Sequence, residues 1–357
     1  MLNQQLLQAF GLNLNANHAR LKNLCLLVSA VLLHRTVNLV ILATTSDDKK
    51  VSNESRYRRF QDFFQRFELC LPSVGRIILS RIPKPPAGYL LAMDRTNWQF
   101  GRRDINFLVI AIVVGSVVWK VLPKKTKRGN SNTSQRITLT KALLKLISAG
   151  KIEALTMDRE FIGKQWLRWL DEQGVSYVVR IKKNVIVGQY QASELACGKG
   201  KKPVGAQEIF GLKLFFSSKS MKAGGRADWL FVVSNRFQGQ EALALYRRRW
   251  GIERLFGHLK KKGFDLEATH MTDGAKLEKL FAVVVLAFLF SFSWGCHLRA
   301  TSQKTSSHSK RKSLFRLGLE DILKLLNSPL EKMQRSQELK EFLLWLKKAK
   351  FDSIFLV

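Results

Sequence analysis

Hydrophobic and polar segments alternate between residues 88 and 184 in a way that predicts a sheet with interleaved helices. Three apolar, β-branched segments come first and predict strands: YLLAMD (89–94), INFLVIAIVV (105–114) and SVVWKVL (116–122). A helix, a strand, a second helix and a last strand are predicted next, at 138–148, 151–158, 160–174 and 175–183. This order of elements predicts an α/β core.

The first part of the chain has a helical pattern instead. Residues 1–82 carry amphipathic segments with basic patches such as RYRRFQDFFQRFE (56–68), and we predict a helical DNA-binding region there. A helix with an aromatic core stripe and a solvated charged face explains the same pattern equally well. The proline-rich segment RIPKPPAGY (81–89) separates this region from the predicted sheet.

Residues 185–235 interrupt the alternation of strands and helices. They are rich in Gly and Lys and contain short β-like pieces such as IFGLKLFF and WLFVVSN, which predicts a β-rich insertion. The core would then comprise residues 88–184 and 236–300. A Ser/Thr/Lys-rich stretch opens the final region, 301–357, which we predict to be helical and to contribute to a dimer.

One apolar run, Leu280–Cys296, raises the question of a membrane span. Its length of about 17 residues is at the short limit for a span. Polar sequence on both sides favours a helix buried in a large core, without membrane association, and a single span is the alternative. The N-terminus lacks the pattern of a signal peptide, so we expect a cytoplasmic protein.

The charge balance narrows the class of partner. Lys and Arg total 60 against 27 Asp and Glu, which gives a formal net charge of +33. A folded chain with so large a charge is expected to bind a polyanion, usually nucleic acid. An anionic membrane surface is the weaker alternative. The four Cys are too widely spaced for a zinc site and predict free thiols in a reducing compartment.

Two of the predicted strands end in an aspartate, Asp94 and Asp158. Aspartates at the carboxyl ends of neighbouring strands point into the crevice where α/β proteins place their sites. Two such carboxylates repel each other unless a cation neutralises them, and oxygen ligands suit Mg²⁺ or Mn²⁺. A turn-forming Asp at the end of a strand is the alternative interpretation of each residue.

The segment YRRRWGIERLFGHLK (246–260) predicts a basic helix with a single acid, Glu253. At about 100° per residue, five of its side chains share one face: Tyr246, Arg249, Trp250, Glu253 and Lys260. Glu253 is therefore a candidate third carboxylate for a two-metal site. An ordinary surface helix with Glu/Lys pairs is the alternative, but it leaves the aromatic residues on the charged face unexplained.

Four of these residues stand as Y-x2-R-x3-E-x6-K. The spacing resembles the Y-R-E-K signature of DDE transposases from bacterial cut-and-paste insertion sequences of family four. Further segments resemble that family in order along the chain: AMDRTNW (92–98), TMDREF (156–161), YVVRIKKN (177–184) and KSLFRLGLEDI (312–322). The resemblance covers most of residues 88–325, and the first 80 residues match no motif.

The resemblance implies a ribonuclease H-like α/β fold, in which flanking helices cover a mixed sheet and a β-rich insertion precedes the helix with the last acid. It implies that Asp94, Asp158 and Glu253 are catalytic and hold two Mg²⁺ or Mn²⁺ ions. The enzyme would cut at transposon ends and join the 3′ ends to target DNA. In relatives the DNA is released through a hairpin intermediate. We expect a homodimer when the protein is bound to DNA.

The DNA-binding residues predicted on this basis are Tyr246, Arg249, Trp250, Lys260, Arg95 and Thr96. The signature Tyr, Arg and Lys would grip phosphates near the cut, and Trp250 is a candidate to receive a flipped base. Arg95 fits a phosphate contact by its charge, whereas Thr96 fits a phosphate contact or a turn cap equally. The nearby acids Asp104 and Glu160 are interpreted as bystanders.

Two other functions fit the same residues. A ribonuclease H-like nuclease would cut donor DNA without ever joining its ends to a target. A catalytically inert DNA-binding protein would keep the basic surface without the chemistry. The presence of all three acids and of the full signature favours the transposase over a decayed copy.

Overall fold

The computed structural model describes residues 6–7, 14, 16–45, 50–82, 85–112, 115–122, 131–196, 205–223, 226–301, 312–327 and 341. The predicted C-terminal region at 301–357 falls largely outside these residues, and so does its predicted contribution to a dimer. One helix of that region, α13 (Leu314–Asn327), is described and packs on the core.

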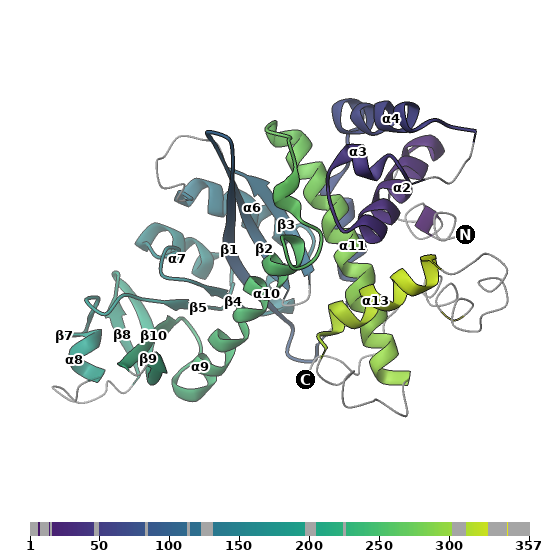
Figure 1. The fold of residues 1–357 in the computed structure, drawn as a ribbon. Helices are drawn as coiled ribbons and strands as arrows, with labels where there is room; N and C mark the ends of the chain where they lie inside the picture. Colours follow the sequence, from purple (N-terminus) through teal and green to yellow (C-terminus); the bar gives the residue numbers. More distant parts are fainter. Residues whose placement is uncertain are drawn as a thin grey trace.

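A mixed sheet of eight strands forms the centre of the described fold (Figure 1). The strands are β1 (Tyr89–Phe100), β2 (Arg103–Ile112), β3 (Gly115–Val121), β4 (Ile152–Met157), β5 (Tyr177–Arg180), β8 (Ala206–Ile209), β9 (Leu212–Ala223) and β10 (Arg226–Ser234). Their order across the sheet is β3-β2-β1-β4-β5-β10-β9-β8. Strands β1, β4 and β5 are parallel, and the other neighbours are antiparallel. The predicted α/β class is confirmed.

The predicted order of elements between residues 88 and 184 is also confirmed. Helix α6 (Thr133–Leu144) connects β3 to β4, and α7 (Lys164–Glu172) connects β4 to β5. Asn132 begins α6 with a capping box, in which its side chain and that of Gln135 each accept a backbone N–H. A short 3-10 turn, η1 (Ala149–Lys151), leads directly into β4.

Strand β1 is longer than predicted. The sequence predicted an end at Asp94, but β1 continues to Phe100 because β2 pairs with it along that whole length, from Leu91↔Ile112 to Phe100↔Arg103. Asp94 therefore lies in the middle of a strand. The apolar run ends at Asp94, next to the point where β4, the partner on the other side, ends at Met157. Beyond that point β1 is paired on one edge only.

The predicted β-rich insertion extends the main sheet. Strand β10 pairs with β5 through Val232↔Arg180, Val233↔Val179 and Ser234↔Val178, and β9 and β8 follow. A small two-stranded sheet of β6 (Ile186–Val187) and β7 (Tyr190–Gln191) and the short helix α8 (Ala192–Ala196) lie beside these strands (Figure 1). The backbone groups of β5 are thereby paired on both edges, as a buried strand requires.

The described part of the N-terminal region contains α2 (His18–His34), α3 (Leu39–Leu42), α4 (Asn53–Arg66) and α5 (Leu71–Arg81). Three aromatic side chains of α4 are buried, Phe60, Phe63 and Phe64, and Tyr57 is partly buried. Each buried phenylalanine contributes roughly 1.5–3 kcal/mol by leaving water. Arg56 is buried too, and its guanidinium donates to the carbonyls of Ala43 and Val51 at 2.8 Å each. The aromatic stripe of this segment is therefore core, while Arg58, Arg59 and Arg66 stay exposed.

Helix α11 (Gly274–Thr301) runs between the sheet and the N-terminal helices (Figure 1). Of the described helices, it alone is long and apolar enough to cross a membrane. Its most apolar 18-residue window is 89% buried inside the protein, against β3, α2, α5 and α13. This agrees with the prediction of a core helix for Leu280–Cys296.

Two glycines allow α11 and α13 to approach closely. A Cβ on Gly295 would lie 1.8 Å from the carbonyl oxygen of Leu314, and one on Gly318 would lie 1.9 Å from that of Ser291. Both distances are far inside van der Waals contact. Beside this crossing the indole N–H of Trp294 donates to Asp321 at 2.7 Å, which fixes the register of the two helices.

Replacing Gly318 with Ala should lower the free energy of unfolding by about 1–3 kcal/mol, because the added methyl group must push the helices apart. Urea denaturation would measure this. Gly150→Ala is the matched control, since a Cβ there meets nothing within 4 Å. Equal stability of the two variants would contradict this close crossing of α11 and α13.

Candidate active site

The pairing of β1 with β4 places two predicted acids next to each other. The last paired residues of these parallel strands are Met93 and Met157, so the next residue on each strand is Asp94 and Asp158. Asp94 is followed by more of β1, whereas Asp158 begins a turn in which the N–H of Phe161 donates to the Asp158 carbonyl at 2.9 Å. The two aspartates are neighbours, as the sequence predicted, but only Asp158 follows the end of its strand, because Asp94 lies inside β1.

The predicted helix over 246–260 is divided into α9 (Gly239–Arg248) and α10 (Trp250–Leu259). The residue between them is Arg249, whose φ of −52° and ψ of −33° remain helical. Its N–H bonds to the carbonyl of Tyr246, and its carbonyl accepts from Ile252, both with a spacing of three residues. The chain therefore tightens by one 3-10 step at Arg249, and the relation of Tyr246, Arg249 and Glu253 stays close to that predicted.

Arg249 links the first and third acids. Its guanidinium donates through Nη1 to Asp94 Oδ2 at 2.7 Å and through Nη2 to Glu253 Oε1 at 2.5 Å. The Arg249 side chain is 9% exposed, against 19% for Asp94 and 33% for Glu253. A buried guanidinium thus holds together two carboxylates that would otherwise repel each other.

Tyr246 brings in the second acid. Its hydroxyl donates to Asp158 Oδ1 at 3.2 Å, and the Arg249 guanidinium lies over its ring, 5.6 Å from the centroid. Tyr246 itself is buried, on the inner face of α9. Tyr246 and Arg249 together connect Asp94, Asp158 and Glu253, which come from β1, the end of β4 and α10.

The protonation of the site follows from this burial. Loss of solvent raises the pKa of Asp94 to about 6, and the Arg249 charge and hydrogen bonds lower it only in part. Burial alone would lower the pKa of Arg249, but Tyr246 and the three acids outweigh it and raise that pKa further. Arg249 is therefore a permanent cation in the site, and Asp94 is ionised at neutral pH.

The donor set suits a hard divalent cation. Three carboxylates lie around the Arg249 guanidinium, whose single positive charge offsets only one of their negative charges. Carboxylate oxygens are the ligands that Mg²⁺ and Mn²⁺ prefer. Among the described residues, no three His, Cys, Asp or Glu side chains already stand in a ready metal-binding cluster. Arg249 instead bridges two of the acids.

Trp250 and Lys260 lie at the two ends of α10. Trp250 is 61% exposed, directly beside the buried Arg249. Lys260 lies away from the acids: its ammonium donates to the carbonyl of Asn97 at 2.7 Å and pairs with Glu267 at 3.0 Å, beside the 3-10 turn η2 (Leu266–Ala268). The predicted shared face of the helix therefore runs along β1. Arg249 lies at Asp94, and Lys260 lies at Asn97, three residues further along the strand.

The two predicted DNA contacts that follow Asp94 have different environments. Thr96 is 4% exposed, which disagrees with a direct contact between its hydroxyl and a phosphate. Arg95 makes a bidentate pair with Glu160, with Nε to Oε1 at 2.7 Å and Nη2 to Oε2 at 2.5 Å. Glu160, interpreted from the sequence as a bystander, is therefore the partner of Arg95.

Sequence reasoning also missed Arg136 on α6. This residue is 6% exposed and donates to the carbonyl of Glu160 at 3.0 Å and to that of Ser131 at 2.7 Å. Its guanidinium lies 5.2 Å from the centre of the Phe161 ring. The predicted helix began at residue 138, so Arg136 fell in the basic polar segment before it, where an arginine is expected to be solvated.

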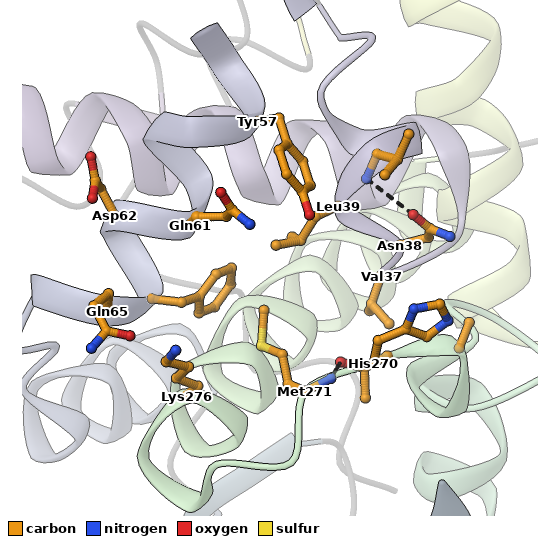
Figure 2. Close-up of a pocket in the computed structure, with 14 residues that line it drawn as sticks. Val37, Asn38, Leu39, Tyr57, Gln61, Asp62, Gln65, His270, Met271 and Lys276 are labelled. Atoms are coloured by element: carbon orange, nitrogen blue, oxygen red, sulfur yellow. Dashed lines mark hydrogen bonds between the residues drawn. The ribbon is translucent and has the colours of Figure 1, made fainter. Parts of the chain in front are cut away.

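A pocket of about 470 Å³ lies elsewhere, between α3, α4 and the segment 268–276 (Figure 2). Figure 2 shows Tyr57, Gln61 and Gln65 of α4 on one side and His270 and Met271 on the other. Its lining includes none of the three acids. The His270 ring stacks on Phe100 at the far end of β1, with centroids 5.2 Å apart.

The described fold is an eight-stranded mixed sheet with flanking helices. Residues 85–290, more than half of the chain, match the family described as Transposase DDE domain, and the protein belongs to that family. Membership implies a DNA-binding enzyme that cleaves DNA and transfers strands. Members of the family generally use divalent metal ions.

Among solved structures, the chain is similar to the piggyBac transposase in a cryo-EM structure of its synaptic complex with hairpin DNA. The match has 13% sequence identity and a TM-score of 0.43, and it covers 95% of this chain and 77% of that chain. No curated protein matches the chain.

Replacing Arg249 with Gln should lower the stability of the metal-free protein by about 1–3 kcal/mol, because two acids lose their buried cation. Mg²⁺ should then raise the melting temperature more in the variant than in the wild type, since the competing cation is gone. Thermal unfolding with Mg²⁺ or EDTA measures both effects.

Arg248→Gln is the matched control. The Arg248 side chain is 48% exposed and lies 3.7 Å from Glu153, outside the acid cluster. We expect this variant to keep the stability and the Mg²⁺ response of the wild type. If Arg249→Gln behaved in the same way as the control, Arg249 would not be the counter-cation of the site.

Proposed function

We propose that the protein is the transposase of a bacterial insertion sequence with the Y-R-E-K signature, which cuts at transposon ends and joins the 3′ ends to target DNA. The observation that carries the proposal is the convergence on Arg249 and Tyr246 of three acids from separate elements. An inert DNA-binding protein has no need for buried carboxylates that must be neutralised.

Asp94, Asp158 and Glu253 would hold two Mg²⁺ or Mn²⁺ ions. When bound, such ions neutralise the carboxylates, activate the attacking oxygen and stabilise the leaving oxygen of a phosphodiester. The chain's own residues orient the acids: Arg249 aligns Asp94 with Glu253, and Tyr246 orients the Asp158 carboxylate. Water would be the first nucleophile, and the 3′-hydroxyl that it exposes would be the second.

The DNA backbone would lie along the signature residues. Metal ions held by Asp94 and Glu253 would compete with Arg249 for these acids, and the planar donors of the released guanidinium would match phosphate as well as carboxylate. Lys260 lies further along β1, where its ammonium would meet the backbone of the same transposon end. Each active site treats one end, so we propose a homodimer that holds two ends together.

Trp250 is the candidate for base capture during hairpin formation. It exposes 61% of its surface next to the acids, and stacking on an aromatic ring contributes about 1–3 kcal/mol per base.

Trp250→Ala should leave nicking of the first strand intact and reduce hairpin formation by about tenfold, the loss expected for one stacking contact. Denaturing gels of labelled transposon-end duplexes separate the nick from the hairpin. The matched control is Tyr190→Ala, which removes another exposed aromatic side chain from the small β6–β7 sheet. Wild-type hairpin yield in Trp250→Ala would remove Trp250 from this role.

Each of Asp94→Ala, Asp158→Ala and Glu253→Ala should slow cleavage by about a thousandfold or more, because groups that act as a unit fail together. DNA affinity should stay close to that of the wild type, since phosphate contacts determine it. Cleavage and joining of labelled transposon ends to a plasmid, with Mg²⁺ or with EDTA, would measure this.

The matched control for the acids is Asp104→Ala. Asp104 is an exposed acid on β2 that accepts a hydrogen bond from Gln99. Normal cleavage by any of the three variants would contradict the site. Cleavage without joining would identify a nuclease, and binding without cleavage would identify an inert DNA-binding protein.

A further inference from the structure

The Arg95–Glu160 pair connects the strand of the first aspartate to the turn of the second. Arg95 directly follows Asp94 on β1, and successive side chains of a strand point to opposite faces. The guanidinium of Arg95 grips both carboxylate oxygens of Glu160. Their side chains are only 18% and 22% exposed, so water screens this contact weakly.

Asp158 has no strand to hold it. The backbone pairing of β4 with β1 ends at Met157, one residue earlier. Beyond it, the N–H of Phe161 donates to the carbonyl of Asp158 and closes a turn that includes Glu160. The position of the Asp158 carboxylate relative to Asp94 therefore depends on the Tyr246 hydrogen bond and on what fixes the backbone of this turn.

Arg136 holds the same turn from the helical layer. It donates to the backbone carbonyl of Glu160 while its guanidinium packs on the ring of Phe161, which is fully buried. Two arginines from different elements thus fix one four-residue turn, Arg95 through the Glu160 side chain and Arg136 through its backbone. Neither contact needs DNA.

We propose that Arg95 and Glu160 are positioning residues that set the separation of the Asp94 and Asp158 carboxylates, and that Arg95 does not bind a DNA phosphate. This inference rests on the proposed function of the two aspartates. The reason is geometric: both oxygens of Glu160 already occupy the fork of the guanidinium, and a phosphate would have to break that pair.

The two roles of Arg95 predict different salt dependences. Each phosphate contact adds about 0.9 to the slope of log affinity against log salt. A positioning residue adds nothing to that slope, but a displacement of about 1 Å in a reacting group costs about a hundredfold in rate. The salt dependence of DNA affinity and the nicking rate, measured on the same variants, therefore distinguish a phosphate-binding residue from a positioning residue.

The experiment compares Arg95→Ala, Glu160→Ala and the double variant with the wild type. It measures the affinity for a labelled transposon-end duplex across a range of salt concentrations and the single-turnover nicking rate at saturating DNA. It also measures Mn²⁺ binding to the free protein by electron paramagnetic resonance. Arg168→Ala, which removes an exposed arginine from α7, is the matched control for loss of one charge.

We expect both single variants to keep the wild-type affinity and salt slope, and to nick about tenfold to a hundredfold more slowly. Both should bind Mn²⁺ more weakly. The double variant should be no slower than either single variant, because one interaction is lost in all three. Arg95→Lys should recover only part of the rate, since an ammonium cannot reproduce the bidentate contact.

A salt slope reduced by about one in Arg95→Ala, with a normal Glu160→Ala, would overturn the proposal in favour of a phosphate contact. Multiplicative rate losses in the double variant would overturn it too. If Glu160→Ala does not fold, Glu160→Gln keeps the shape without the charge and carries the same expectations. A wild-type protein that does not nick DNA would instead contradict the proposed function itself.

Discussion

The contact between Arg249 and two carboxylates is the interaction on which the site depends. Asp94 and Glu253 are 159 positions apart in the sequence. Their carboxylates are partly buried near each other and would repel without a cation between them. One guanidinium with two aligned donors satisfies both, and the Tyr246 ring packs beneath it. The chain makes its 3-10 step at Arg249, between α9 and α10. The residue at which the helix tightens is thus also the residue that neutralises the two carboxylates.

The sheet supplies the other half of the site. Parallel pairing of β1 and β4 determines that Asp94 and Asp158 follow the same paired methionines. The early end of β4 leaves the second aspartate on a turn, while β2 pairs with β1 for seven more residues, from Asp94 to Phe100. One acid is therefore held by backbone pairing and the other by side chains. This difference explains why arginines gather around the 158–161 turn and not around Asp94 alone.

The large positive charge of the chain has more than one use. Arg56, Arg136 and Arg249 are buried, and their guanidiniums satisfy backbone carbonyls or carboxylates inside the protein. Arg95 is largely buried against Glu160. Other basic residues, such as Arg58 and Arg59 on α4, remain exposed and available to a polyanion. The net charge predicted a polyanionic partner, but it did not indicate which arginines would be exposed to bind that partner.

The sequence by itself determined the order of strands and helices between residues 88 and 184 and the core helix α11, and it predicted the three acids, because hydrophobic periodicity and helical spacing are local properties. Only the tertiary structure decided that β10 would join β5, that Thr96 would be buried, and that Glu160 would bind a residue 65 positions away. These are contacts between distant segments. No local pattern encodes them, since an arginine that will be buried against a glutamate has the same sequence signal as one left in water.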